Sequence, residues 1–152
     1  MLTQAKSIFL ADDDADDCFL FEDALKAIEI PTHLTTAQDG VELMKLLHPA
    51  ADNLPYALFL DLNMPRKNGL QCLTEIKRHE KLKFLDVIIL STSFQHDVAN
   101  QLFSLGAKYC VRKPPDFNLF KALIRRILTE KEPHFDIPAS EIEETEKFMF
   151  SS

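Results

Sequence analysis

The chain has 152 residues, of which 46% are hydrophobic and 27% charged, and its net charge is −7. This size and composition predict one globular domain with no membrane span, because no apolar stretch approaches the ~20 residues that cross a bilayer. The acidic balance argues against a nucleic-acid surface, which needs clustered Lys and Arg.

Cysteine and glycine usage excludes further classes of protein. Cys18, Cys72 and Cys110 are odd in number, widely spaced and set in apolar surroundings. This pattern predicts reduced, packed thiols, and with no secretory signal at the N-terminus it predicts a cytoplasmic protein. Only three glycines are present, whereas a phosphate-binding loop or a dinucleotide fingerprint needs several close together. Nucleotide-dependent functions are therefore excluded.

Apolar runs alternate with helical patterns along the chain. Short apolar or β-branched runs predict five strands, over residues 7–11, 33–37, 56–60, 87–90 and 109–112. Apolar residues at helical spacing follow each strand and predict five helices, the fourth ending at Gly106. This alternation predicts an α/β fold, a doubly wound five-stranded parallel sheet in the flavodoxin-like order 2-1-3-4-5, with helices on both faces.

The character of the chain changes near residue 131. The stretch 131–152 has six acids against two lysines, two prolines and no further strand pattern. Ser140 and Glu143 have the spacing of a capping box for a short helix. We therefore expect a domain over 1–130 and an acidic tail over 131–152. We leave open whether this tail is disordered or docks on its own domain, on a second copy in a homodimer, or on a partner.

Five aspartates lie within residues 12–17, directly after the first strand. Asp14, Asp16 and Asp17 are explained as the cap and first-turn acids of the following helix. Asp12 and Asp13 lie where the strand leaves the sheet. Neighbouring carboxylates raise each other's pKa and are costly to pack unless a cation or a proton compensates them. A functional role is the better interpretation for this pair.

Asp61 follows the third strand. If strands one and three are neighbours, Asp61 faces Asp12 and Asp13 where the strand order reverses, which is where sites lie in such sheets. Three converging carboxylates suit a hard divalent cation, and Mg²⁺ suits them best. Asn63 could add its backbone carbonyl.

Ser91 and Lys113 follow the fourth and fifth strands. Hydroxyls after a strand often cap the next helix, and this alternative stays open for Thr92 and Ser93. Lys113 offers a fixed positive charge to an anion. Three acids, a hydroxyl and a lysine suit phosphoryl transfer, with Asp61 attacking phosphorus while Mg²⁺, the lysine and Ser91 stabilise the phosphoryl oxygens.

Four segments, in order and in register, carry a family resemblance: "ADDD", "LFLDLNMPRKNG", "VIILSTS" and "CVRKPP". Over roughly 7–128 the chain resembles the response-regulator receiver domain of two-component signalling, of the stand-alone chemotaxis-regulator type. The resemblance implies that Asp61 is the phosphoacceptor. It also implies that Asp12 and Asp13 bind Mg²⁺, with Asp13 favoured as the direct ligand, and that Asn63 lends its carbonyl to the ion.

The same resemblance implies roles for the last two strand ends. Ser91 is the switch hydroxyl that turns toward the phosphoryl group, Lys113 pairs with that group, and the Lys113–Pro114 bond is cis, which X-Pro bonds permit at small cost. One position departs from the family pattern, because Cys110 stands where an aromatic residue usually couples phosphorylation to the surface. Tyr109 is adjacent, but strand alternation points it to the opposite face.

The resemblance also implies partners. The phosphoryl donor would be a phosphohistidine on a sensor histidine kinase or a phosphotransfer protein. Only about 20 residues follow the last helix, too few for an effector domain. We therefore expect the protein not to be an enzyme beyond assisting its own phosphorylation and dephosphorylation. It would signal through phosphorylation-dependent binding to an unknown downstream protein.

Two alternatives belong to other classes. A phosphatase of the haloacid-dehalogenase type also uses a strand-end Asp with Mg²⁺, but it needs a second acid two residues later, where this chain has Asn63, and a cap insertion that the chain lacks. A phosphorylation-silent receiver used as a binding module would lack an acid, the hydroxyl or the lysine, and here all are present. Failure to bind Mg²⁺ would support the silent receiver.

Overall fold

The computed structural model describes residues 5–92 and 96–129. Its elements in chain order are β1 (Lys6–Ala11), α1 (Ala15–Ala27), β2 (Thr32–Ala37), α2 (Gly40–Leu47), the 3₁₀ turn η1 (His48–Ala50), β3 (Ala57–Asp61), α3 (Gly69–Arg78), the 3₁₀ turn η2 (Leu82–Phe84), β4 (Val87–Ser91), α4 (His96–Ser104), β5 (Tyr109–Arg112) and α5 (Phe117–Thr129).

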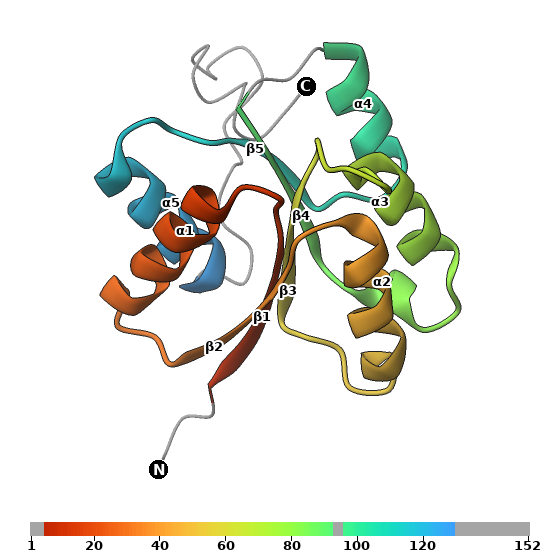
Figure 1. Cartoon of the computed structure of the whole chain (residues 1–152), viewed down its shortest axis with the longest axis horizontal. Coiled ribbons are helices and arrows are strands. Elements are labelled where there is room, and N and C mark those ends of the chain that lie inside the picture. The colour runs from red at the N-terminus through yellow and green to blue at the C-terminus, as the bar shows by residue number, and fades with distance from the viewer. Residues whose placement is uncertain (1–4, 93–95, 130–152) are drawn as a thin grey trace.

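The five strands form one parallel sheet in the order β2-β1-β3-β4-β5. Helices α1 and α5 cover one face of this sheet, and α2, α3 and α4 cover the other (Figure 1). The predicted fold class and strand order are therefore confirmed. The order reverses between β1 and β3, so that the carboxyl ends of these two strands lie side by side.

The burial of each strand follows its place in the sheet. Every residue of β3 and β4 is buried, as expected for central strands covered by helices on both faces. The edge strand β2 is polar and only its last residue, Ala37, is fully buried. The sheet therefore holds β3 and the residue that ends it firmly in place.

Two apolar cores lie on the two faces of the sheet. The core under α1 and α5 is organised around Phe21, whose ring lies 4.9 Å from the ring of Phe59 and 6.1 Å from that of Phe120, in edge-on geometry. The other core joins α2, α3 and α4 through residues such as Leu43, Leu73 and Leu102. The helices on each face of the sheet thus bury their own apolar side chains against the strands.

The predicted strand boundaries agree with the structure to within one residue at each end. The two 3₁₀ turns were not predicted. The predicted stop at Gly106 is confirmed, because Gly106 has a φ of 109° and its N–H donates to Phe103 while that of Ala107 donates to Leu102. These two bonds form a Schellman cap, which favours glycine at the left-handed position.

The described residues do not test the predictions for the C-terminal tail or for the location of the protein in the cell. The acidic tail over 131–152, with its capping box, lies outside them, so the division of the chain at residue 130 stays a prediction. Within 5–92 and 96–129, no helix has both the length and the hydropathy that crossing a membrane requires. The cytoplasmic location also stays a prediction.

Candidate functional site

Asp61 is the last residue of β3 and is 8% exposed. The register places it opposite Leu90 of β4, and its predecessor Leu60 opposite Ala11 of β1. Its carboxylate therefore emerges between the ends of the two neighbouring strands. A residue with this burial and charge needs a specific compensating environment.

The loop after Asp61 is folded tightly back onto β3. The N–H of Gly69 donates to the carbonyl of Leu62 at 2.9 Å, and a Cβ on Gly69 would lie 2.5 Å from the carbonyl oxygen of Asp61. Only glycine fits such an approach. Asn68 then caps α3 in a reciprocal capping box with Gln71. The sequence after Asp61 thus fixes its backbone against the start of α3.

The aspartates after β1 divide as predicted, with one exception described below. Asp14 is the N-cap of α1 and accepts from the N–H groups of Asp16 and Asp17 at 2.8 and 3.2 Å. Asp12 is only 2% exposed and accepts from the N–H of Asp14 at 2.9 Å. Asp13 is exposed.

The carboxylates of Asp12, Asp13 and Asp61 come together. Each offers one oxygen, and these oxygens all lie within 4.8 Å of one another. Oxygen donors in this number and arrangement match the preference of Mg²⁺ and similar hard cations, which take the rest of their coordination from waters and phosphate oxygens. These three residues could therefore hold a divalent cation.

Lys113, just beyond β5, reaches into the same cluster, and its side chain is 13% exposed. Its Nζ lies 2.8 Å from Asp12 Oδ2, 3.1 Å from Asp17 Oδ2 and 3.9 Å from Asp61 Oδ1. The lysine is thus bonded to two carboxylates and only near the third.

The pKa values reflect this crowding. Burial raises the pKa of Asp61 to about 6, in spite of the opposing effect of Lys113, and Asp12 and Asp13 add to the rise. Burial also raises the pKa of Asp12, against its hydrogen bond to Lys113. Burial alone would lower the pKa of Lys113, but the hydrogen bond to Asp12 and the nearby acids outweigh it, so this pKa is raised. The cluster therefore carries negative charge that one lysine does not fully neutralise.

Ser91 ends β4 and is 1% exposed. Its carbonyl accepts from the backbone N–H of Lys113 at 2.8 Å, which ties the end of β5 to the end of β4. No buried side-chain nitrogen or oxygen in the described part of the chain lacks a hydrogen-bond partner. Of the two hydroxyls for which a capping role was left open, Thr92 is exposed and Ser93 lies outside the described residues.

Asn63 contributes through its backbone. Its N–H donates to the Asp61 carboxylate and opposes the rise of the pKa of that acid. The side chain of Asn63 is exposed. The predicted role of its carbonyl as a metal ligand stays a prediction.

Cys110 and Tyr109 point to opposite faces of β5, as strand alternation predicts. Cys110 is 1% exposed and packs in the core under α3 and α4, whereas Tyr109 packs against the core under α1 and α5. Burial raises the pKa of the Cys110 thiol to about 12, which leaves it protonated and poorly reactive. The site therefore has no aromatic side chain at the position of Cys110.

Two expectations need correction. The Lys113–Pro114 bond was predicted to be cis, but the described residues contain no cis peptide bond, so this prediction is wrong. Asp17 was explained only as a first-turn acid of α1, yet it also forms an ion pair with Lys113. The residue pattern offers no separate signal for this contact, because an acid in a first turn is already explained by the helix dipole.

The site is thus a strand-end carboxylate in an acidic cluster on a doubly wound sheet, with a lysine beside it and a buried serine at the end of the neighbouring strand. Comparison with known proteins gives the family. Residues 8–125 match the response regulator receiver domain, and the chain belongs to that family. Proteins of this family generally act in signalling and not as enzymes.

Two relatives illustrate the match, one of them both by sequence and by structure. The response regulator Rcp1 of Synechocystis sp. is 34% identical over 96 residues, covering 60% of this chain and 65% of that protein, a little under two thirds of its length. The structure of the phosphorylated cyanobacterial phytochrome response regulator RcpA has 31% identity and a TM-score of 0.75, over 82% of this chain and 91% of that one. The Mn²⁺-bound structure of Rcp1 has 28% identity and a TM-score of 0.72, over 80% and 91%.

Proposed function

We propose that this protein is a response regulator that accepts a phosphoryl group on Asp61 from a phosphohistidine of a sensor histidine kinase or a phosphotransfer protein. One observation carries the proposal. The Asp61 carboxylate is buried at the end of β3, its pKa is raised to about 6, and it lies beside two further carboxylates and 3.9 Å from the nitrogen of Lys113. Such a carboxylate can act as a nucleophile on phosphorus.

Asp12, Asp13 and Asp61 would hold Mg²⁺, with the carbonyl of Asn63 as a further ligand. The three carboxylates fit the ion because their oxygens already lie within 4.8 Å of one another, and because Asp12 and Asp61 are buried with their charge only partly balanced by Lys113. When bound, Mg²⁺ supplies positive charge that neutralises the oxygens of the incoming phosphoryl group. The Mn²⁺-bound form of Rcp1 supports a divalent cation in this family.

The remaining site residues would recognise the phosphoryl group. Lys113 has a third N–H donor to offer to a phosphoryl oxygen, and its position beside Asp61 makes this a short movement. The hydroxyl of Ser91, one residue beyond the partner of Asp61 in β4, would hydrogen-bond another oxygen. The structure of phosphorylated RcpA supports phosphorylation as a property of such relatives.

Phosphorylation would add almost two negative charges to the already acidic end of the sheet. This change would bias the receiver, over residues 1–130, between two states with different affinity for a downstream protein. Because Cys110 replaces an aromatic side chain, the change would be passed on by the movement of Lys113 and Ser91 at the ends of β4 and β5. The acidic tail over 131–152 is a candidate site of the response.

The test is the intact mass of the protein after incubation with acetyl phosphate. With Mg²⁺ we expect one added phosphoryl group on the wild type, and none on Asp61→Asn or after chelation of the metal. Glu75→Gln, which removes a carboxylate on α3, serves as a matched control and should be labelled like the wild type. If the wild type gains no phosphoryl group and also fails to bind fluoroberyllate, the chain is a silent receiver and the proposal is wrong.

A further inference from the structure

Lys113 divides its hydrogen bonds between Asp12, just after β1, and Asp17 in the first turn of α1, and Asp17 lies outside the predicted site. Its Nζ donates to Asp12 at 2.8 Å and to Asp17 of α1 at 3.1 Å. Asp61 is 3.9 Å away, which is beyond hydrogen-bond distance. An ammonium group has three N–H donors, so two of the three are already directed away from the phosphoacceptor.

The surroundings of Asp17 favour a real interaction with Lys113. The side chain of Asp17 is 38% exposed and that of Lys113 is 13% exposed, so the pair is less accessible to water than a typical surface pair. Both side chains line a small cavity of about 50 Å³ that also contacts Leu20, Pro114 and Phe120. The apolar part of this lining reduces screening on one side of the pair.

A phosphoryl group on Asp61 would bring new anionic oxygens beside Lys113, and to bind them fully the lysine would have to turn its N–H groups from Asp12 and Asp17 toward them. Charge-assisted hydrogen bonds between an ammonium and an anionic oxygen are about 2.7–2.9 Å long. The bond to Asp17 holds the lysine toward α1, and the charge of Asp17 also opposes a new anion nearby. Both effects weaken the binding of a phosphoryl group on Asp61 to Lys113.

We propose that Asp17 is a positioning residue that holds Lys113 away from Asp61 in the resting protein and competes with the phosphoryl group for this lysine. Asp17 thereby lowers the affinity of the site for a phosphoryl group and shifts the receiver toward its resting state. The inference rests on the proposed function, since it concerns the same phosphoacceptor.

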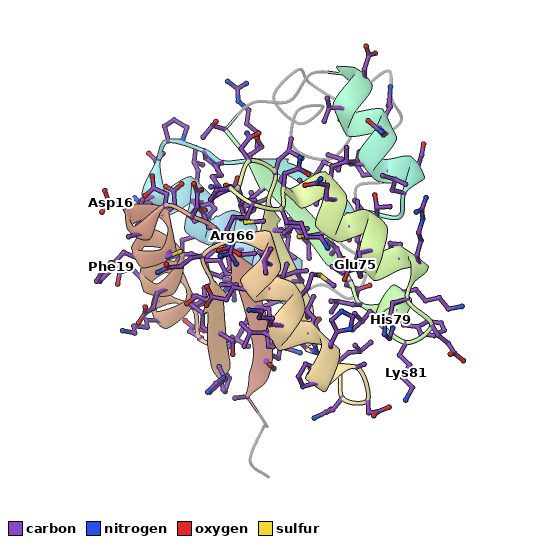
Figure 2. The ribbon with its side chains drawn as sticks, turned by 45° about the vertical axis from the view of Figure 1, so that its right-hand side comes forward. Asp16, Phe19, Arg66, Glu75, His79 and Lys81 are labelled. Carbon is purple, nitrogen blue, oxygen red and sulfur yellow. The ribbon has the colours of Figure 1, made fainter. Side chains whose placement is uncertain are left out.

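Asp16 provides a matched control. It precedes Asp17 in the first turn of α1, carries the same charge, and complements the helix dipole in the same way. It is exposed, and it takes part in none of the ion pairs found within the described residues, 5–92 and 96–129. Figure 2 shows its side chain at the outer side of α1. Asp16→Asn therefore reports the effect of charge and helix dipole without the contact to Lys113.

The experiment measures the dissociation constant of fluoroberyllate, a phosphoryl mimic, by calorimetry on the full chain at saturating Mg²⁺. We expect Asp17→Asn to bind about two- to fivefold more tightly than the wild type, the range typical of partly exposed ion pairs. Asp16→Asn should change the constant less, and Asp17→Glu should return it toward the wild-type value. In a Lys113→Ala background the gain from Asp17→Asn should shrink, because the effect acts through the lysine.

Each other outcome overturns the inference. Unchanged or weaker binding by Asp17→Asn would show that Asp17 does not compete for Lys113. An equal gain in Asp16→Asn, or an undiminished gain without Lys113, would show a general effect of charge. If the wild type neither binds fluoroberyllate nor gains a phosphoryl group, the proposed function fails and this inference fails with it. If the wild type is phosphorylated but Asp17→Asn binds fluoroberyllate as the wild type does, this inference alone is overturned.

Discussion

Asp61 and Glu75 are carboxylates that each lie near a lysine, yet their pKa values move in opposite directions. Burial raises the pKa of Asp61 to about 6, although Lys113 opposes the rise. For Glu75 the hydrogen bond to Lys67 is the largest effect, and with His48 it lowers the pKa of the acid. The ionised form of Asp61 therefore destabilises the folded protein, whereas the ionised form of Glu75 is stabilised by Lys67 and His48.

The difference follows from where each acid lies. Glu75 is on α3, with 36% of its side chain exposed, in a surface region that it shares with His79, well away from Asp16 and α1 (Figure 2). Asp61 is enclosed by the strand ends, and its nearest lysine is bonded to other acids. A surface cluster that satisfies itself needs no ligand. A buried cluster with unbalanced charge is stabilised by a cation, and acids with pKa values perturbed in this way are candidates for a functional site.

Phosphorylation should depend on Asp61 entirely and on Glu75 not at all. Asp61→Asn removes the only carboxylate that we place as nucleophile, so phosphorylation by acetyl phosphate should fall to background. Glu75→Gln should be phosphorylated at the wild-type rate, because it lies outside the strand-end cluster. The rate of mass gain measures both variants. Wild-type labelling of Asp61→Asn would remove the distinction between the two acids.

Lys113→Ala is expected to have the next largest effect. It leaves Asp12, which is 2% exposed, without its cationic partner, and breaking a buried ion pair is costly. The free energy of unfolding should fall by about 3 kcal/mol without metal, and added Mg²⁺ should restore part of it. Urea denaturation with and without Mg²⁺ gives both values. A loss no larger than that of an exposed lysine such as Lys26→Ala would contradict this account of the site.

The pH dependence of stability should also distinguish Asp61. Its pKa is near 3.8 in the unfolded chain and about 6 in the folded protein. Between these values the folded protein binds more protons, so the free energy of unfolding falls as the pH rises, by on the order of 3 kcal/mol. Without metal, Asp61→Asn should lack this component and be the more stable protein at pH 7. If the free energy of unfolding depends on pH in the same way for both proteins, folding does not raise the pKa of Asp61.

The smallest effect is expected at Glu75. Its lowered pKa means that its contribution to stability is present above its unfolded value near 4.5 and is lost as the pH falls. Glu75→Gln should lower the free energy of unfolding by less than about 1 kcal/mol at pH 7, because the ion pair of Glu75 with Lys67 is partly exposed and is screened by solvent. High salt should remove most of the difference in urea denaturation. A salt-independent loss above that size would mean that the surface cluster behaves like the buried one.

Most of the strand-end site could be predicted because its residues lie at or within two residues of the ends of the strand patterns. The alternation of strands and helices sets the order of the sheet, and the order places Asp12, Asp13 and Asp61 at one point. Asp17 could not be assigned in the same way, since capping and the helix dipole already explain an acid in a first turn. Its contact with Lys113 depends on how closely α1 packs beside the end of β5, which the residue pattern does not determine.

The Lys113–Pro114 bond could not be decided from the residues either. The two isomers of an X-Pro bond differ by only about 0.5–1 kcal/mol, so the surrounding structure determines the isomer. The balance of pKa values was also beyond prediction, because it depends on the burial of Asp61 and on the distances to Lys113. What the residues do give is the position of Asp61 and the kinds of groups around it.

The location of the phosphoryl group decides whether Asp61 is the phosphoacceptor. After phosphorylation with acetyl phosphate and Mg²⁺, reduction by borohydride converts an aspartyl phosphate to homoserine, and peptide mass spectrometry locates the changed residue. The account predicts homoserine at position 61 and at no other aspartate. Homoserine at Asp12 or Asp13, or none in a protein whose intact mass shows a phosphoryl group, would contradict it.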